Sequence, residues 1–193
     1  MMRKIERENT GLLHAGQDLV VAGYAGLAGT VKLAEAKEEE LSRWFSNEYM
    51  EEIAGCSRYL LREEKGFWSD CGAAEWEPAG KGGILTAIWN LTGAYETGVE
   101  FYLRQIPIRQ ETVEVCERLE LNPYRLYSQG CVLLTADNGG QLVCALAAKN
   151  IPAQVIGRVN KGIAREMIVQ EGRGFMERPQ PDEITKVIPG FFE

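Results

Sequence analysis

A glycine-rich loop that opens directly into a helical segment is the clearest candidate for a binding site. Residues 77–84 are Glu-Pro-Ala-Gly-Lys-Gly-Gly-Ile, which places Gly80, Lys81, Gly82 and Gly83 at the expected start of a helix. Glycines let the backbone approach a ligand closely, and the free N–H groups and the dipole of a helix start favour an anion. We therefore predict that these four residues bind a phosphate or a carboxylate. The alternative is that Gly82 and Gly83 only permit close packing.

Two other motifs have weaker chemical meaning. The segment 23–30 contains Gly-x-x-Gly-x-x-Gly, but no acidic residue stands at the distance that a dinucleotide-binding fold requires. We expect Gly29 to permit close packing instead. Arg109 and Glu111 stand at the start of another helical segment, where we expect a cap region with a solvated charge pair.

The nucleophiles and metal ligands of the chain are few. His14 is the one histidine and lies in a polar N-terminal stretch, so triad chemistry is disfavoured and acid–base work would depend on carboxylates or lysine. The five cysteines are an odd number without a Cys-x-x-Cys pair, which is typical of reduced thiols. We predict no metal and no cofactor.

Charge and hydropathy exclude several classes of protein. The chain has 193 residues and a formal net charge of −7, which disfavours nucleic-acid binding. Its longest apolar runs have the length of strands, so we expect no membrane span. The charged N-terminus does not resemble a secretory signal, and we expect a cytoplasmic protein.

Hydrophobic periodicity predicts an alternation of strands and helices. Period-two or apolar runs predict strands at 18–23, 73–77, 99–103, 131–136 and 153–157, with a closing hairpin at 164–169 and 174–176. Apolar residues at spacings of three and four predict helices after residue 26 and over 38–54, 84–95, 109–119 and 141–149. We expect the aromatic side chains of 38–54 to face the core. The fold class is α/β (α+β), a mixed β-sheet covered by helices. We expect a lead at 1–15, a domain at 16–180 and a surface tail at 181–193.

Several of these segments together resemble one family. Residues 99–116, which include Ile-Pro-Ile-Arg-Gln-Glu-Thr at 106–112, and the segments 121–126 and 128–134 resemble the C-terminal domain of AIR synthase related proteins. That superfamily includes aminoimidazole ribonucleotide synthase, formylglycinamide ribonucleotide amidotransferase, selenophosphate synthetase, thiamine monophosphate kinase and the hydrogenase-maturation carbamoyl dehydratase. The last of these is the most similar, and the likeness spans nearly the whole chain from about residue 16, with Pro179, Asp182 and Glu183 near its end.

The resemblance implies half of an ATP-dependent enzyme. Complete members place an ATP-binding domain before this one, which the short lead cannot contain, and the glycine pair faces the cleft between the two domains. Members commonly carry His-Asp-x-Thr-x-Gly-Gly before the helix, whereas residues 76–81 here are Trp-Glu-Pro-Ala-Gly-Lys. The carbamoyl dehydratase ends in a reactive cysteine, and this chain ends in Pro-Gly-Phe-Phe-Glu. Carbamoyl chemistry is therefore not expected.

Three hypotheses for function remain open. The first is a stand-alone, non-catalytic module that binds a phosphorylated or carboxylated small molecule or regulates a partner. The second is a subunit that completes an ATP-dependent enzyme with a separate ATP-binding N-terminal domain protein, or with a second copy in a homodimer. The third is a self-associating structural module that docks through Phe191 and Phe192.

Overall fold

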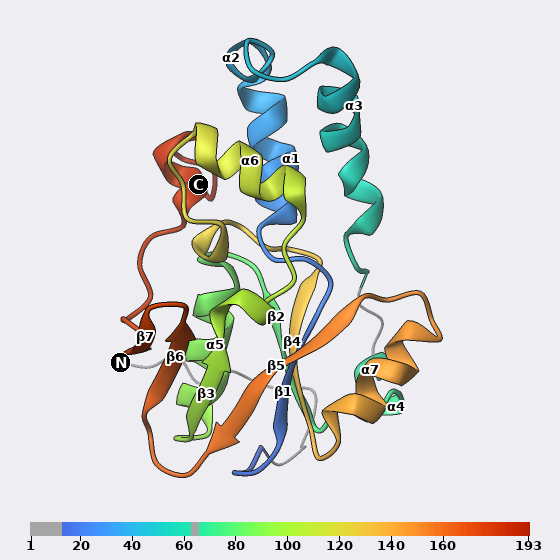
Figure 1. Ribbon diagram of the computed structural model, residues 1–193, viewed down its shortest axis with the longest axis vertical. Coiled ribbons are helices and arrows are strands. Elements are labelled where there is room, and N and C mark those ends of the chain that lie inside the picture. The colour runs from blue at the N-terminus through green and yellow to red at the C-terminus, as the bar shows by residue number, and fades with distance from the viewer. Residues whose placement is uncertain (1–12, 63–65) are drawn as a thin grey trace.

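A mixed β-sheet forms the centre of the molecule in the computed structural model, which describes residues 13–62 and 66–193 (Figure 1). The strands are β1 (Asp18–Ala22), β2 (Glu75–Ala79), β3 (Gly98–Tyr102), β4 (Cys131–Ala136), β5 (Ala153–Asn160), β6 (Arg165–Val169) and β7 (Gly172–Phe175). Their order is β2-β4-β1-β5-β3-β6-β7, and every neighbouring pair is antiparallel except β3 and β6. The predicted fold class, a mixed sheet covered by helices, is confirmed.

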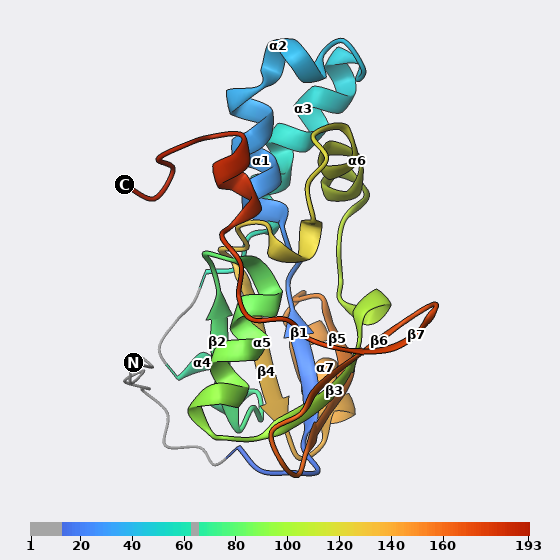
Figure 2. The same ribbon diagram turned by 90° about the vertical axis from the view of Figure 1, so that its left-hand side faces the viewer.

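The helices lie in three places around this sheet. They are α1 (Leu27–Ala36), α2 (Glu38–Leu41), α3 (Asn47–Gly55), α4 (Phe67–Asp70), α5 (Gly83–Ala94), α6 (Gln110–Arg118) and α7 (Gly139–Ala147). Helix α5 covers one face of the sheet, and α7 with α4 covers the other (Figures 1 and 2). Helices α1, α2, α3 and α6 gather at one end of the sheet (Figure 1). The start of α5 therefore lies between the sheet and this group of helices.

The central strand β1 contributes side chains to both faces. Leu19 and Val21 point to the side of α5, whereas Val20 and Ala22 point to the side of α7. This alternation follows from the period of two in an extended chain, and all four side chains are fully buried because both faces are covered.

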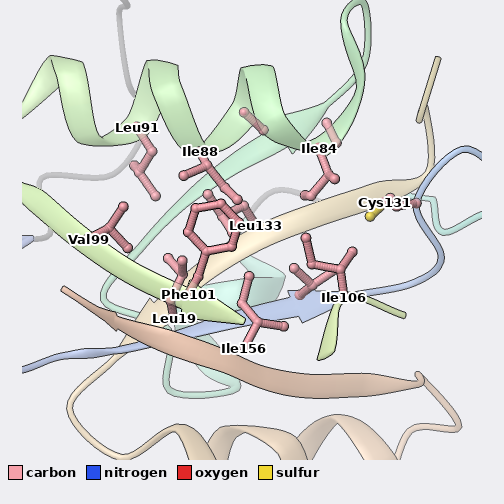
Figure 3. Packing of buried hydrophobic residues seen from close by; sticks show 14 of the residues in the cluster. Leu19, Ile84, Ile88, Leu91, Val99, Phe101, Ile106, Cys131, Leu133 and Ile156 are labelled. Carbon is pink, nitrogen blue, oxygen red and sulfur yellow. The ribbon is translucent and has the colours of Figure 1, made fainter. Parts of the chain in front are cut away.

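The core beneath α5 holds that helix on the sheet (Figure 3). Ile84, Ile88 and Leu91 follow at spacings of four and three, so one face of α5 is apolar. They pack against side chains from β1, β3, β4 and β5, among them Leu19, Val99, Phe101, Leu133 and Ile156. Each buried aliphatic side chain contributes about 1.5–3 kcal/mol, which fixes the position of the preceding glycine loop.

The segment predicted as one helix over 38–54 consists of two helices. Helix α2 ends at Leu41, and α3 begins at Asn47, where the hydroxyl of Ser46 accepts a hydrogen bond of 3.2 Å from the N–H of Tyr49. That hydroxyl cap defines a new helix start. The prediction of a buried aromatic stripe was wrong for Trp44, which is 64% exposed and contacts the guanidinium of Arg118.

The C-terminal segment is anchored at its beginning. Asp182, Glu183 and Ile184 are buried, and a short 3-10 helix spans Glu183–Lys186. The start of the expected surface tail thus belongs to the packed structure, whereas the division into domains stays a prediction. Residues 1–12 of the expected lead lie outside the described part of the chain. Among the described residues, every helix is too short or too polar to cross a membrane.

Candidate functional site

The predicted glycine loop lies between β2 and α5. Gly80 follows the end of β2, Gly82 precedes α5, and Gly83 is the first residue of that helix. The N–H of Gly83 donates to the carbonyl oxygen of Gly80 over 3.0 Å, which closes the turn. The φ angles of Gly82 and Gly83 are 82° and 69°, in the left-handed region that favours glycine.

Close packing accounts for Gly83. A Cβ atom there would lie 2.4 Å from the carbonyl oxygen of Tyr124 and 2.8 Å from the Cα of Arg125, both backbone atoms. These residues belong to the 3-10 helix Pro123–Arg125, which crosses the start of α5. At Gly80, by contrast, a Cβ would meet no atom within 4 Å. The packing interpretation is therefore supported at Gly83.

A carboxylate of the chain itself occupies the start of α5. The Oδ2 of Asp182 accepts a hydrogen bond of 2.6 Å from the N–H of Gly82, 100 residues away in sequence. Its Oδ1 accepts from the N–H of Ile184 at 2.9 Å and from that of Tyr127 at 3.1 Å. The Asp182 carboxylate thus binds where the helix dipole favours an anion.

Two opposing effects act on the acidity of Asp182, which is only 2% exposed. Burial raises its pKa above the usual range, and the three N–H donors oppose this rise because they favour the charged form. The three N–H donors therefore favour the charged form of this carboxyl group, whereas its burial disfavours that form.

Lys81 contacts the C-terminal segment. Its Nζ lies 4.7 Å from the ring centroid of Phe192, which packs edge-to-face against Phe191 and Tyr127. Both phenylalanines are partly buried against the core cluster beside α1 and α6. The structure thus brings together the four predicted residues and a C-terminal segment that sequence reasoning had not connected with them.

Glu111 is buried and its partner Arg109 is partly buried, so the interpretation of this pair as a solvated charge pair was wrong. Arg109 donates from Nε to Oε2 of Glu111 at 3.0 Å and from Nη2 to Oε1 at 2.6 Å. Glu111 is 3% exposed, and the guanidinium lies 4.4 Å from the ring centroid of Tyr59 and 5.5 Å from that of Tyr24. Burial alone would raise the pKa of Glu111, but the hydrogen bonds and charge of Arg109 hold it below its usual range.

A cavity of about 350 Å³ borders this pair. It is lined by Tyr24, Tyr49, Glu52, Arg109, Gln110 and Glu111. The guanidinium of Arg109 binds a carboxylate and lies near two aromatic rings. Its charge is therefore already paired within the protein. We assign the pair to holding α6 against the residues around Tyr24 and Tyr59.

The remaining sequence candidates are structural or exposed. A Cβ at Gly29 would lie 2.5 Å from Cγ of Leu126, as expected for close packing of α1. The N–H of Gly26 donates to the buried hydroxyl of Ser128 at 2.8 Å. His14 is largely exposed, with its Nε2 at 3.2 Å from Oδ1 of Asp137. Among the described residues, no group of three His, Cys, Asp or Glu side chains is placed to hold a metal ion.

Part of the chain matches a known protein family. Residues 79–170 match the family model of the AIR synthase related protein, C-terminal domain. A protein of Methanocaldococcus jannaschii, whose name assigns it to hydrogenase expression/formation, is 26% identical over 114 residues, covering 55% of this chain and 33% of that protein.

Solved structures share the fold. Escherichia coli HypE, a hydrogenase maturation protein, matches with a TM-score of 0.66 and 19% identity over 89% of this chain and 52% of that chain. Thiamine-monophosphate kinase from Stenotrophomonas maltophilia matches with a TM-score of 0.61 and 18% identity over 83% of this chain and 52% of that one. Other HypE structures with the same fold are complexes with ATP and with HypF. The chain spans about half the length of these solved relatives.

Proposed function

Because residues 79–170 match the family model of the AIR synthase related protein, C-terminal domain, we propose that the protein is a binding or regulatory module of that family. In this proposal it performs no catalysis alone and takes a phosphorylated or carboxylated small molecule at Gly80, Lys81, Gly82 and Gly83. The observation that carries the proposal is the carboxylate of Asp182 on the N–H of Gly82. An anion fits this helix start, and the chain supplies one of its own.

In this proposal, a ligand binds by taking the place of the Asp182 carboxylate at the start of α5. An incoming phosphate or carboxylate replaces the Asp182 oxygen on Gly82 and draws the ammonium of Lys81 away from the Phe192 ring. Hydrogen bonds to a charged group contribute about 1.5–3 kcal/mol each, so Asp182 competes with the ligand. The module would bind its ligand more tightly when Asp182 is neutral.

A thermal-shift screen tests this exchange. The probes are inorganic phosphate, ATP with magnesium, ribose phosphates, carbamoyl phosphate and thiamine phosphates. They are measured on the wild type, on Asp182→Asn and on Lys81→Ala, with Lys161→Ala as a matched exposed control. A ligand at one hundred times its Kd stabilises by about 2.7 kcal/mol. We expect at least one phosphorylated probe to shift Asp182→Asn more than the wild type, and Lys81→Ala less.

Two outcomes would count against the exchange. If no probe shifts either the wild type or Asp182→Asn, the helix start holds only its internal carboxylate. If Lys161→Ala reduces the shift as much as Lys81→Ala, the probe binds by general charge attraction and not at the glycine loop.

A second candidate function rests on the length of the relatives. The matched part is about half of HypE and of thiamine-monophosphate kinase, and one HypE structure is a complex with ATP. This observation favours a subunit that completes an ATP-dependent site with a separate ATP-binding N-terminal domain protein, or with a second copy of itself. Size-exclusion chromatography with light scattering measures self-association. Co-purification with such a domain protein, followed by an ATPase assay of the mixture, tests whether the two proteins form an ATP-dependent site together.

A further inference from the structure

A groove among the first three helices lies apart from the glycine loop. It encloses about 480 Å³ between α1, α2 and α3, three helices that lie at the upper end of the molecule in Figure 1. Val31 and Ala34 of α1 and Met50 and Ala54 of α3 form its apolar walls. The groove also lies outside residues 79–170, the segment that matches the family model.

The rim of this groove is acidic. Glu35, Glu38 and Glu51 line it, one from each of α1, α2 and α3. Of the described residues that line the groove, none is lysine or arginine. Glu35 also pairs with Lys32 at 2.8 Å on the exposed side of α1, so Glu38 and Glu51 contribute most of the negative charge of the rim.

The chain segment that carries most of the groove residues is acidic. Residues 35–54 contain seven glutamates against one lysine and one arginine, a net charge of −5 out of −7 for the whole chain. Charges of one sign that surround a low-dielectric surface attract a partner of opposite sign and orient it before contact. The groove is therefore complementary to a positively charged, partly apolar partner.

We propose that this groove binds a basic amphipathic helix of a partner protein. An amphipathic helix places its apolar face into an apolar groove at spacings of three and four, and lysine or arginine on its flanks would meet the three rim glutamates. The ten residues of α1 extend over about 15 Å, which matches two to three turns of the partner helix. This proposal does not depend on anion binding at the glycine loop.

Fluorescence anisotropy of a labelled synthetic helix on the full chain tests the proposal. The probe is a peptide of leucine, alanine and lysine of about five turns, ~18 residues, with all leucines on one face. One comparison peptide has the same composition but leucines on every face, and another has glutamate in place of lysine. We expect the basic amphipathic peptide to bind at least about tenfold more tightly than either.

Two sets of variants place the binding in the groove. Glu35→Gln, Glu38→Gln and Glu51→Gln together remove the rim charge, and Glu96→Gln, Glu117→Gln and Glu171→Gln remove as much charge from exposed positions elsewhere. Ala54→Trp fills the groove from an exposed position without changing charge. We expect the rim variant and Ala54→Trp to weaken binding about tenfold, and the control to change it less than about twofold. If circular dichroism shows that the rim variant does not fold, the binding measured with Ala54→Trp tests whether the peptide lies in the groove.

Four results would overturn the proposal. Equal binding of the shuffled peptide, or equal loss in the control variant, would reduce the effect to general attraction by a negative surface. Full binding to Ala54→Trp would place the peptide elsewhere. Displacement of the probe by spermine at concentrations below the Kd of the peptide would assign the groove to small polycations.

Discussion

Gly83 offers the sharpest test of how the glycine loop is built. A methyl group added there meets two costs: the left-handed φ of 69°, and a contact of 2.4 Å with the carbonyl oxygen of Tyr124. The backbone conformation costs about 1–2 kcal/mol for a residue with a Cβ. Relief of the contact needs a shift of main-chain atoms, which costs about 1–3 kcal/mol, as overpacking does elsewhere. Alanine also makes the unfolded chain less flexible than glycine does, which offsets these costs by about 0.4–1 kcal/mol.

Gly83→Ala should therefore lower the free energy of unfolding by about 1–5 kcal/mol. The matched control is Gly80→Ala in the same loop, where the added Cβ has open space and the φ angle lies outside the left-handed region. We expect this control to be neutral or to stabilise by about 0.4–1 kcal/mol. Urea unfolding, followed by circular dichroism and tryptophan fluorescence, measures both.

The two variants separate packing from ligand binding. A loss below about 1 kcal/mol in Gly83→Ala would refute the packing argument, as would an equal loss in Gly80→Ala. If the argument holds, failure of a Gly83 variant to bind an anion reports unfolding of the loop and is no proof of a binding site. Variants at Lys81 and Asp182 are then the informative ones.

Three further predictions concern the buried carboxylates. Glu111→Gln should cost about 2–3 kcal/mol in urea unfolding, because it leaves the Arg109 guanidinium without its charged partner, whereas Glu114→Gln on the same helix should stay within about 0.5 kcal/mol. Arg109 lowers the pKa of Glu111, so the stability that this carboxylate adds should be complete above its ordinary pKa of 4.5 and should be lost as the pH falls below it. A difference in the free energy of unfolding between wild type and Glu111→Gln that stays the same from pH 7 to pH 3 would contradict this. Asp182→Ala should cost about 1–3 kcal/mol by leaving three N–H donors unpaired, and hydrogen exchange at Gly82 should accelerate; slow exchange there would show that another group caps α5.

Local patterns were sufficient to predict most of the elements. The apolar run of β4 and the strand-to-glycine boundary after β1 are local signals, and so is the spacing of Ile84, Ile88 and Leu91 on α5. The division between α2 and α3 also had a local signal, because Ser46 is a residue type that often caps a helix. The aromatic spacing across 38–54 concealed it.

The occupant of the glycine loop could not be predicted in this way. Asp182 reaches Gly82 only because the chain returns past α5 after forming the whole sheet, and no spacing rule connects residues 100 positions apart. The burial of Glu111 has a similar origin. Its partner Arg109 is two residues away, but Tyr24 and Tyr59, which cover the guanidinium, come from segments before β2.

The order of the strands has a consequence for how the chain folds. The first strand, β1, lies between β4 and β5, so Asp18 pairs with Ala136 and with Arg158. Neither partner exists while the first hundred residues are being made. At about 5–20 residues per second, β1 waits on the order of ten seconds on the ribosome. During that time its apolar residues cannot be buried in the sheet, and contacts of such long sequence separation slow folding. The central part of the sheet can therefore form only after β4 and β5 have been made.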